Sequence, residues 1–148
     1  MLKTKSPRMG DMSVSVEGIK SIDIEYSVFS KDKQFLGAVS ILIKHVEMIR
    51  SIAETIEKDL GVKHWAIQKD GHILYETDPT KTVLNIFADP PYKDYPELIA
   101  LGKLIIKEKE GEGFSSFLDS GTKNVVKKRA VWKTVHFCNN DWIIVTYN

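Results

Sequence analysis

The sequence predicts an α+β fold, in which a five-stranded antiparallel sheet carries helices on its faces and follows an N-terminal β-hairpin. Three observations predict it. Residues 21–28 alternate between polar and apolar, and an apolar run follows at 35–43. Apolar residues then recur at helical spacing over 46–60. After Gly61 the order is a hairpin, a loop, a helix and three strands.

Composition places the chain among ordinary globular domains. It has 148 residues, 43% of them hydrophobic and 28% charged, enough to bury a core without disulfides or metal. The net charge of +1 gives no field that attracts nucleic acid, and the basic run 127–129 lacks alternating aromatic residues. No apolar run reaches the roughly 18 residues that span a bilayer, so we expect membrane contact only through segments absent from this chain.

The two ends of the chain differ in character. Residues 1–19, broken by Pro7 and Gly10, are expected to form a flexible lead-in. The C-terminal run "DWIIVTYN" stops on an apolar strand pattern, which favours a fragment of a longer protein over a simple terminal strand. We therefore expect a lead-in over 1–19, a hairpin with a connecting helix over 20–60, and a separate domain over 61–148.

The first helix is predicted over residues 44–60 by one narrow apolar stripe. Gly61 ends it, at a position where glycine adopts the left-handed conformation cheaply. Packing on the protein's own sheet and a homodimer seam both account for such a stripe. The preceding run 35–43 would be apolar on both faces of a strand, as expected of a strand that is covered on both faces. The stripe consists of Val46, Ile49, Ala53, Ile56 and Leu60.

The stretch "QKDGHILYETD" holds three acids and a histidine within residues 68–78. Asp70-Gly71 between two β-rich runs predicts a tight hairpin turn, and Asp78-Pro79 predicts the next turn. Asp70 and Asp78 are therefore explained without catalysis. Residues 79–94 hold three prolines and no sustained period, which predicts a long loop of the kind that often carries function.

The remaining elements are a helix and three strands. Asp94 and Glu97 form a capping-box pattern at the start of the helix, and "EGEG" at 110–113 is expected to end it. The strands are expected in "FSSFLD", in 125–137 and in "WIIVTY", with the last two joined at Asn139-Asn140.

No pattern in the sequence favours catalysis or a cofactor. The chain has no nucleophile elbow, and its Gly-x-Gly follows a helix instead of a strand. The single cysteine, Cys138, lies beside a turn between apolar strands and is expected to be structural. The four histidines lack metal-ligand spacing. We therefore expect neither an enzyme nor a metal site. The histidines are His45, His64, His72 and His136.

Aromatic and polar residues around the long loop have the composition of a small-molecule pocket. A filled aromatic core is the alternative. Asp89 is expected to orient a polar or cationic group, and also to pair with Lys128 if that lysine points inward. Gln68 could point into the same space. The residues expected to line the pocket are Trp65, Tyr75, Phe87, Asp89, Tyr92, Lys128 and Trp132.

Several features in this order resemble the Cache family, the extracytoplasmic PAS-like (PDC) sensor domains of prokaryotic histidine kinases and chemoreceptors. The resemblance covers roughly residues 61–148. It rests on the hairpin from Trp65 to Asp78, the Asn85-Ile86-Phe87 turn with Asp89-Pro90, the Gly-x-Gly before an aromatic strand, and the closing strand from Asp141-Trp142.

This resemblance implies a non-enzymatic, PAS-like sensing domain outside the cytoplasm. It implies that a small solute binds between the sheet and residues 79–112, and that terminal helices pass a shape change to a membrane partner. The arginine–tryptophan–tyrosine–aspartate pattern of amino-acid binders in the two-module members is not matched here, which leaves the ligand open. The alternative is a ligand-free structural or dimerisation module of a membrane receptor, joined through helix 44–60.

Overall fold

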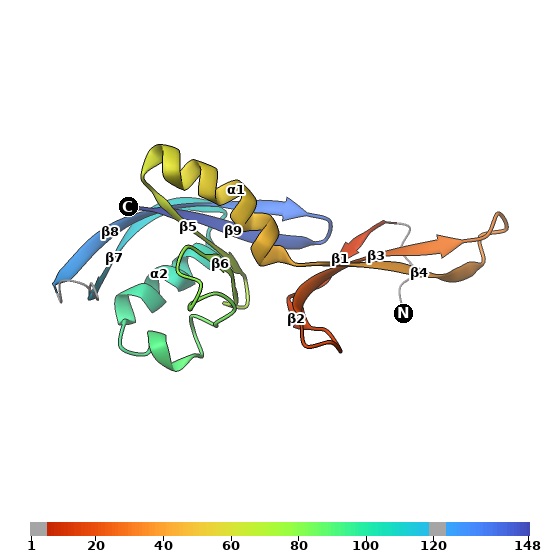
Figure 1. The fold of residues 1–148 in the computed structure, drawn as a ribbon, viewed down its shortest axis with the longest axis horizontal. Coiled ribbons are helices and arrows are strands. Elements are labelled where there is room, and N and C mark those ends of the chain that lie inside the picture. Colours follow the sequence, from red (N-terminus) through yellow and green to blue (C-terminus); the bar gives the residue numbers. More distant parts are fainter. Residues whose placement is uncertain (1–5, 119–123) are drawn as a thin grey trace.

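The computed structural model describes residues 6–118 and 124–148 (Figure 1). Its main body is a five-stranded antiparallel sheet with the strand order β6-β5-β9-β8-β7. Helix α1 covers one face, and α2 with the loop before it covers the other. The predicted α+β fold is confirmed. The elements are α1 (His45–Leu60), β5 (Lys63–Gln68), β6 (Ile73–Glu76), α2 (Pro96–Lys107), β7 (Glu110–Leu118), β8 (Val125–Phe137) and β9 (Asn140–Tyr147).

The sheet needs cover on both faces because its central strands are apolar on both. In β9, Ile143 and Val145 are fully buried in the core on the α2 side. Ile144, between them, packs into the second core beneath α1. This alternation follows from the period of two in a strand. A single covering layer would leave one of these apolar sets in water.

Helix α1 ends where the sequence predicts. Gly61 adopts φ 65° and donates its N–H to the carbonyl of Glu57 at 2.9 Å. The predicted stripe divides between two environments. Its first part, including the buried Ala53, packs on the sheet. Ile56 and Leu60 are 39% and 69% exposed, so the stripe only partly serves the protein's own core.

The start of α2 differs from the predicted capping box. The helix begins at Pro96, and Tyr95 occupies the cap position without a side-chain hydrogen bond. Glu97 instead accepts a hydrogen bond from the backbone N–H of Ser116 at 2.9 Å. This carboxylate therefore fastens α2 to β7. Before the helix, the long loop contains a 3₁₀ turn, η1 (Pro90–Tyr92).

The two glycines of "EGEG" lie inside β7, and not in a helix terminator as expected. A Cβ atom at Gly111 would lie 2.5 Å from the indole ring of Trp132, and one at Gly113 would lie 2.6 Å from a methyl group of Leu101. Glycine is required because the neighbouring side chains approach the backbone closely. Asp119, the last residue of the predicted strand "FSSFLD", is outside the described residues.

The Asp70-Gly71 turn is confirmed. Gly71 has φ 94°, and the backbone N–H of His72 donates to the Asp70 carboxylate at 3.0 Å. The β8–β9 turn lies one residue earlier than predicted. Phe137 pairs with Asn140, so Cys138 and Asn139 form the turn, with Cys138 at φ 55°.

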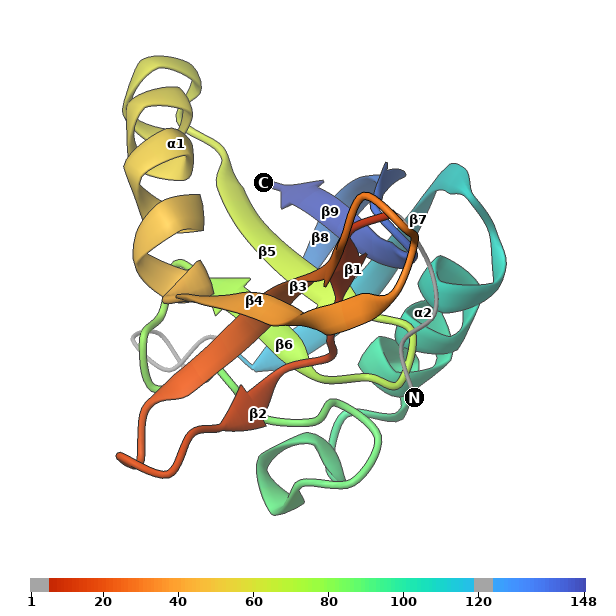
Figure 2. The same ribbon diagram turned by 90° about the vertical axis from the view of Figure 1, so that its right-hand side faces the viewer.

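The N-terminal hairpin consists of β3 (Lys20–Phe29) and β4 (Phe35–Ile43), and it projects beyond the main sheet (Figures 1 and 2). Two short strands, β1 (Arg8–Met9) and β2 (Ser13–Val14), pair with β3. Part of the expected flexible lead-in therefore has strand structure. The expectation that 35–43 is covered on both faces is wrong, because most side chains of β4 are exposed.

Residues 9–12 are hydrogen-bonded to the end of the main sheet that holds the β8–β9 turn. The N–H of Met9 donates to the side chain of Asn139 in the β8–β9 turn at 2.7 Å. Gln68 accepts from the N–H of Met12 at 3.2 Å and donates to Asp11 at 3.0 Å. Gln68, which was expected to point into the pocket, therefore holds the hairpin against the sheet.

The close contact at Gly111 yields a stability prediction. Gly111→Ala should lower the free energy of unfolding by about 1–3 kcal/mol, because the added methyl group forces the buried Trp132 ring to move. Urea denaturation measures the change. Val125→Ala, at a 74% exposed position in the neighbouring strand, is the control and should change stability by less than about 0.5 kcal/mol. Equal effects of the two substitutions would contradict this packing.

Candidate functional site

A pocket of about 680 Å³ lies between the sheet and the loop with α2. This volume is in the range of sites that hold small organic molecules. β5, β6, β7, β8 and β9 each contribute side chains to it, so its wall is the rigid sheet. Its lining consists of Lys63, Trp65, Ile73, Glu76, Asp78, Lys81, Ile86, Pro91, Tyr92, Tyr95, Leu98, Leu101, Ser115, Lys128, Ala130 and Tyr147.

Glu76 places a carboxylate in the pocket wall. The hydroxyl of Tyr147 donates to it at 2.6 Å, which orients the carboxylate. Burial raises the pKa of Glu76 above its usual range, although the Tyr147 hydrogen bond and the charge of Lys81 oppose the shift. Burial also raises the pKa of Tyr147, so this phenol stays a hydrogen-bond donor at neutral pH. The pair offers a polar site that a positive group would stabilise.

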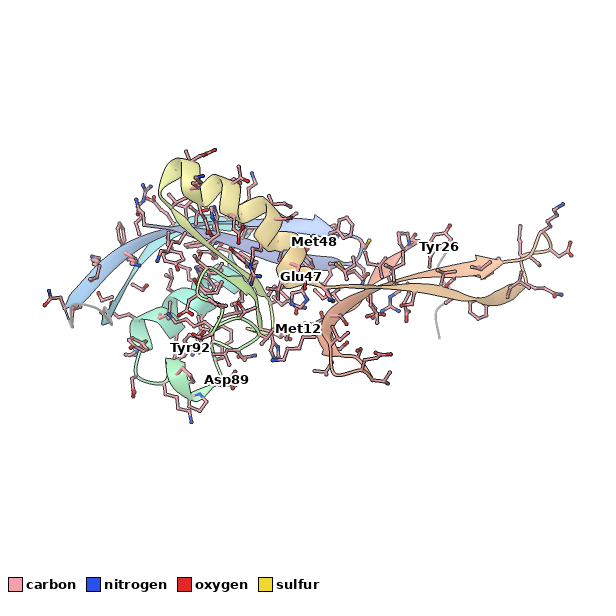
Figure 3. All side chains as sticks on the ribbon, viewed as in Figure 1. Met12, Tyr26, Glu47, Met48, Asp89 and Tyr92 are labelled. Carbon is pink, nitrogen blue, oxygen red and sulfur yellow. The ribbon has the colours of Figure 1, made fainter. Side chains whose placement is uncertain are left out.

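Tyr92 contributes a hydroxyl that has no hydrogen-bond partner within the described part of the chain. Its side chain is 5% exposed, and it enters from η1 on the α2 side of the sheet, as Figure 3 shows. Burial raises its pKa as well. A buried polar group without a partner costs about 1–3 kcal/mol. A ligand that hydrogen-bonds this hydroxyl would recover that free energy.

The pocket also carries positive charge. Lys63, Lys81 and Lys128 line it, and the Lys128 ammonium lies 4.9 Å from the centre of the Tyr147 ring. Lys81 lies 3.5 Å from Asp78, whose pKa is lowered by hydrogen bonds from Thr80. Acidic and basic groups therefore share one cavity, and this arrangement suits a ligand that carries both charges.

Of the residues that the sequence placed in the pocket, Trp65, Tyr92 and Lys128 line it. Trp132 does not, because its ring fills the core beside Gly111 and its N–H donates to the carbonyl of Glu108 at 3.3 Å. The aromatic composition of the strands placed Trp65 and Trp132 on this side of the sheet, where they lie, but it also placed Tyr75 here, and Tyr75 lies on the other side. It could not separate rings that pack the core from rings that face the cavity.

Phe87 and Asp89 of the long loop also lie outside the pocket. Phe87 packs beside Gly71 and Gly102, where a Cβ atom would meet its ring at 2.4 Å and 3.2 Å. The Asp89 carboxylate turns back and accepts from the N–H of Asn85 at 2.6 Å. Asp89 therefore shapes its own loop and does not face Lys128. Asp89 is not among the residues that line the pocket, and its expected role at the ligand stays a prediction.

Tyr75 lies on the opposite face of the sheet, and a β-bulge explains why. Trp65 pairs with Glu76 and Ala66 with Tyr75, but Ile67 pairs with Ile73, so Leu74 is an extra residue. The bulge turns Tyr75 toward α1, where its hydroxyl is 3.5 Å from Glu57. The same bulge turns Glu76 into the pocket.

The sequence reasoning missed Glu76 and Tyr147 as lining residues. For Tyr147 a signal existed, because Ile143, Val145 and Tyr147 alternate along the last strand and Ile143 and Val145 belong to the same core. For Glu76 the alternation of side chains along β6 pointed to the wrong face of the sheet, because a bulge in so short a strand leaves no signal in the sequence.

In residues 6–118 and 124–148, no three histidine, cysteine or acidic side chains are placed to hold a metal ion. Over the same ranges, neither helix has the length and apolar character needed to cross a bilayer.

Comparison with known proteins places this geometry in context. The family model described as "HK/GC/Chemotaxis protein-like, sensor domain" matches residues 1–45. A search of curated proteins found no match to the chain.

Among solved structures, three similar ones are sensory or ligand-binding proteins. An extracellular ligand-binding receptor from Desulfohalobium retbaense has a TM-score of 0.73 at 22% identity, over 98% of this chain and 23% of its own. The periplasmic sensory domain of the Campylobacter jejuni chemoreceptor Tlp1 has a TM-score of 0.65 at 12% identity, and the match covers 97% of this chain and 49% of that one. The ligand-binding domain of the Pseudomonas fluorescens chemoreceptor CtaA, in complex with L-serine, has a TM-score of 0.60 at 14% identity, and the match covers 97% of this chain and 55% of that one.

The chain thus spans between about a quarter and about half the length of these structures. Their identities are low, so the likeness concerns the fold. The resemblance that the sequence predicted is confirmed at that level. The chain has the fold of the Cache (PDC) sensor domains of chemoreceptors and histidine kinases.

Proposed function

We propose that the chain is a non-enzymatic, extracytoplasmic sensing unit that binds a small zwitterionic solute, such as an amino acid, in the pocket beneath the sheet. The observation that carries this proposal is the buried, unpartnered hydroxyl of Tyr92, a residue that lines the cavity together with Glu76. A solute ammonium group would be attracted to the Glu76 carboxylate and the surrounding aromatic rings. Lys63 and Lys81, which also line the pocket, would attract an anionic group of the solute.

The similar structures support this choice of ligand class. The matched CtaA domain is in complex with L-serine, a small zwitterion. The polar groups of the pocket disfavour a purely apolar ligand, because Glu76 and Tyr92 would then remain without new partners. The cavity of about 680 Å³ leaves room for side chains larger than that of serine.

The pocket is linked to α1 through Glu76, the last residue of β6, and through Thr77, which follows it. Thr77, next to Glu76, donates its hydroxyl to the Glu57 carboxylate of α1 at 2.8 Å. Glu57 also accepts from the backbone N–H of His64 at 3.1 Å, and its carboxylate lies 3.4 Å from the His64 ring. A ligand that shifts Glu76 would therefore pull on the contacts that position α1. We propose this route for the signal.

A second candidate, a dimerisation module, has one observation in its favour. Four apolar side chains at intervals of four residues form an exposed row on α1, between 38% and 69% exposed. Such a row suits a helix–helix contact with a second copy. It consists of Met48, Ile52, Ile56 and Leu60.

The ligand proposal predicts a specific loss of affinity. Amino acids that bind should raise the melting temperature with the logarithm of their concentration, and L-serine is the first probe. Tyr92→Phe should weaken the affinity about tenfold, because one hydrogen bond worth about 1.4 kcal/mol is lost. Tyr75→Phe, on the opposite face, is the matched control and should leave the affinity unchanged. If none of the common amino acids raises the melting temperature, the proposed ligand class is wrong.

The buried carboxylate predicts a pH dependence of stability. Because the pKa of Glu76 is raised in the folded protein above its ordinary 4.5, stability falls as the pH rises from 4.5 through the folded-state pKa. Glu76→Gln lacks this loss, so its free energy of unfolding relative to wild type should increase with pH over that window. Urea denaturation at a series of pH values measures the difference.

Asp78→Asn provides a control of opposite sign. The pKa of Asp78 is lowered in the folded protein from its ordinary 3.8, so its ionisation adds stability as the pH rises toward 3.8. The variant should therefore lose stability relative to wild type over that range. Parallel pH profiles for the two variants would contradict the assigned environments.

The dimerisation candidate predicts a change in association. Ile52→Lys should weaken any concentration-dependent dimer at least tenfold, because it places a charge within the exposed apolar row of α1. Sedimentation equilibrium at several concentrations measures this. Ser51→Lys, at the adjacent exposed position, is the control. A chain that stays monomeric at all concentrations would remove this candidate.

A further inference from the structure

His45 is a buried histidine whose ring has no hydrogen-bond partner. It is the first residue of α1, and only Lys44 separates it from β4 at the point where the hairpin meets the main body (Figure 1). Its exposed fraction is 0%, and neither Nδ1 nor Nε2 has a partner within the described residues. Ser21 lies at the same end of the hairpin, and its buried hydroxyl is likewise unpartnered in that part of the chain. We call residues 43–46 the hairpin joint.

An apolar side chain would suit position 45 better than a neutral imidazole. Neutral imidazole has one donor and one acceptor, and each costs free energy when it is buried without a partner. The next residues on this side of the helix, Val46 and Ile49, pack with Ile22 in the core beneath α1. What a histidine adds to such a place is a charge that appears between pH 5 and 8.

Three features of the hairpin joint oppose a positive charge on this ring. Burial lowers the pKa of His45 below its ordinary 6.5. The ring lies at the N-terminus of α1, where the helix dipole is positive. Lys44, its neighbour in sequence, already carries a positive charge. His45 is therefore neutral at neutral pH, and an imidazolium would have to leave the core to reach water.

The surrounding elements supply no counter-charge to His45 within residues 6–118 and 124–148. These elements are β3, the N-terminal segment, β6 with the turn before it, and the β8–β9 turn. Their ionisable groups, and those of the first turn of α1, contact other residues. They are Glu47, which pairs with Lys44 at 3.7 Å, Asp23 beside Gly10, Asp11 bonded to Gln68, Asp70 paired with His72, Tyr75 near Glu57, and Cys138 in the β8–β9 turn.

The hairpin also has an attachment that does not change charge in this pH range. The N–H groups of Met9 and Met12 donate to the side-chain amides of Asn139 and Gln68 at 2.7 Å and 3.2 Å. Side-chain amides do not titrate between pH 5 and 8. Opening of the hairpin joint would therefore leave the hairpin attached through residues 9–12.

We propose that His45 is an acid-sensitive latch between the N-terminal hairpin and α1. Above pH 6.5 the neutral ring stays buried, and the first turn of α1 stays packed on the sheet. As the pH falls, a proton from water binds the ring whenever this turn opens, and the open form gains population. The hairpin is then held by residues 9–12 alone and moves independently of α1. This inference does not depend on which solute the pocket binds.

The sign of the effect follows from the lowered pKa of His45. Because the open form binds the proton more readily than the closed form, the stability of the closed form is complete above pH 6.5. It is lost as the pH falls from 6.5 through the pKa of the buried ring.

Hydrogen exchange of single amides tests the latch. The N–H groups of Glu47 and Met48 donate to the Lys44 carbonyl at 3.1 Å and 3.2 Å, so they report on the first turn of α1. Their protection factors should fall at least about threefold between pH 7.5 and 5.5, because the open form gains a proton. His45→Leu should remove this fall. His136→Gln, at an exposed histidine, is the matched control and should leave the fall unchanged.

Two further amides distinguish local opening from unfolding of the whole chain. The protection of the Met9 amide, at the other attachment, and of Ile143, in the centre of the sheet, should not fall over the same pH range. A parallel fall at all four amides would overturn the proposal. An equal fall in the wild-type protein and in His45→Leu would also overturn it.

A titration of the wild-type protein keeps the test independent of whether a variant folds. The ring resonances of His45, followed by NMR, should report a pKa below the ordinary 6.5. A ring that titrates at or above 6.5 would overturn the proposal, because acid would then not weaken the hairpin joint.

Discussion

The two-sided burial of β5 and β9 is the constraint on which the rest of this structure depends. Ile143 and Val145 need one apolar layer, and Ala66 and Ile144 need another. Neither α1 nor α2 alone could satisfy both. Along the chain, α1 precedes the strands of this sheet and α2 lies between β6 and β7, and each helix covers one face of the sheet. The pocket is what remains where the loop before α2 covers its face less closely than a continuous helix would.

The sequence was informative wherever a short-range rule determines the structure. The Asp70-Gly71 turn, the end of α1 at Gly61 and the alternation along the last strand all depend on a few adjacent residues, and their structures follow those rules. The order of elements then restricted the fold to one sheet between two layers. Most of the architecture could therefore be predicted, because it follows from local chemistry and from the need to bury both faces.

The errors share a different physical origin. The bulge at Leu74 depends on how β6 meets β5, and it exchanged the faces of Tyr75 and Glu76. Asp89 was expected in the pocket from its position, but a hydrogen bond within its own loop decided its direction. β4 has the composition of a strand buried on both faces, and yet it projects from the main body. Each of these depends on contacts between distant segments, which a local pattern does not contain.

The attachment of residues 9–12 has a mechanical consequence. Asn139 and Gln68 hold this segment at the end of the main sheet, while Lys44 and His45 join the hairpin to α1. Two points of attachment on different elements prevent the hairpin from swivelling freely about a single joint. A force that rotates the outer tip of the hairpin therefore acts on α1 and on the ends of the strands at the same time.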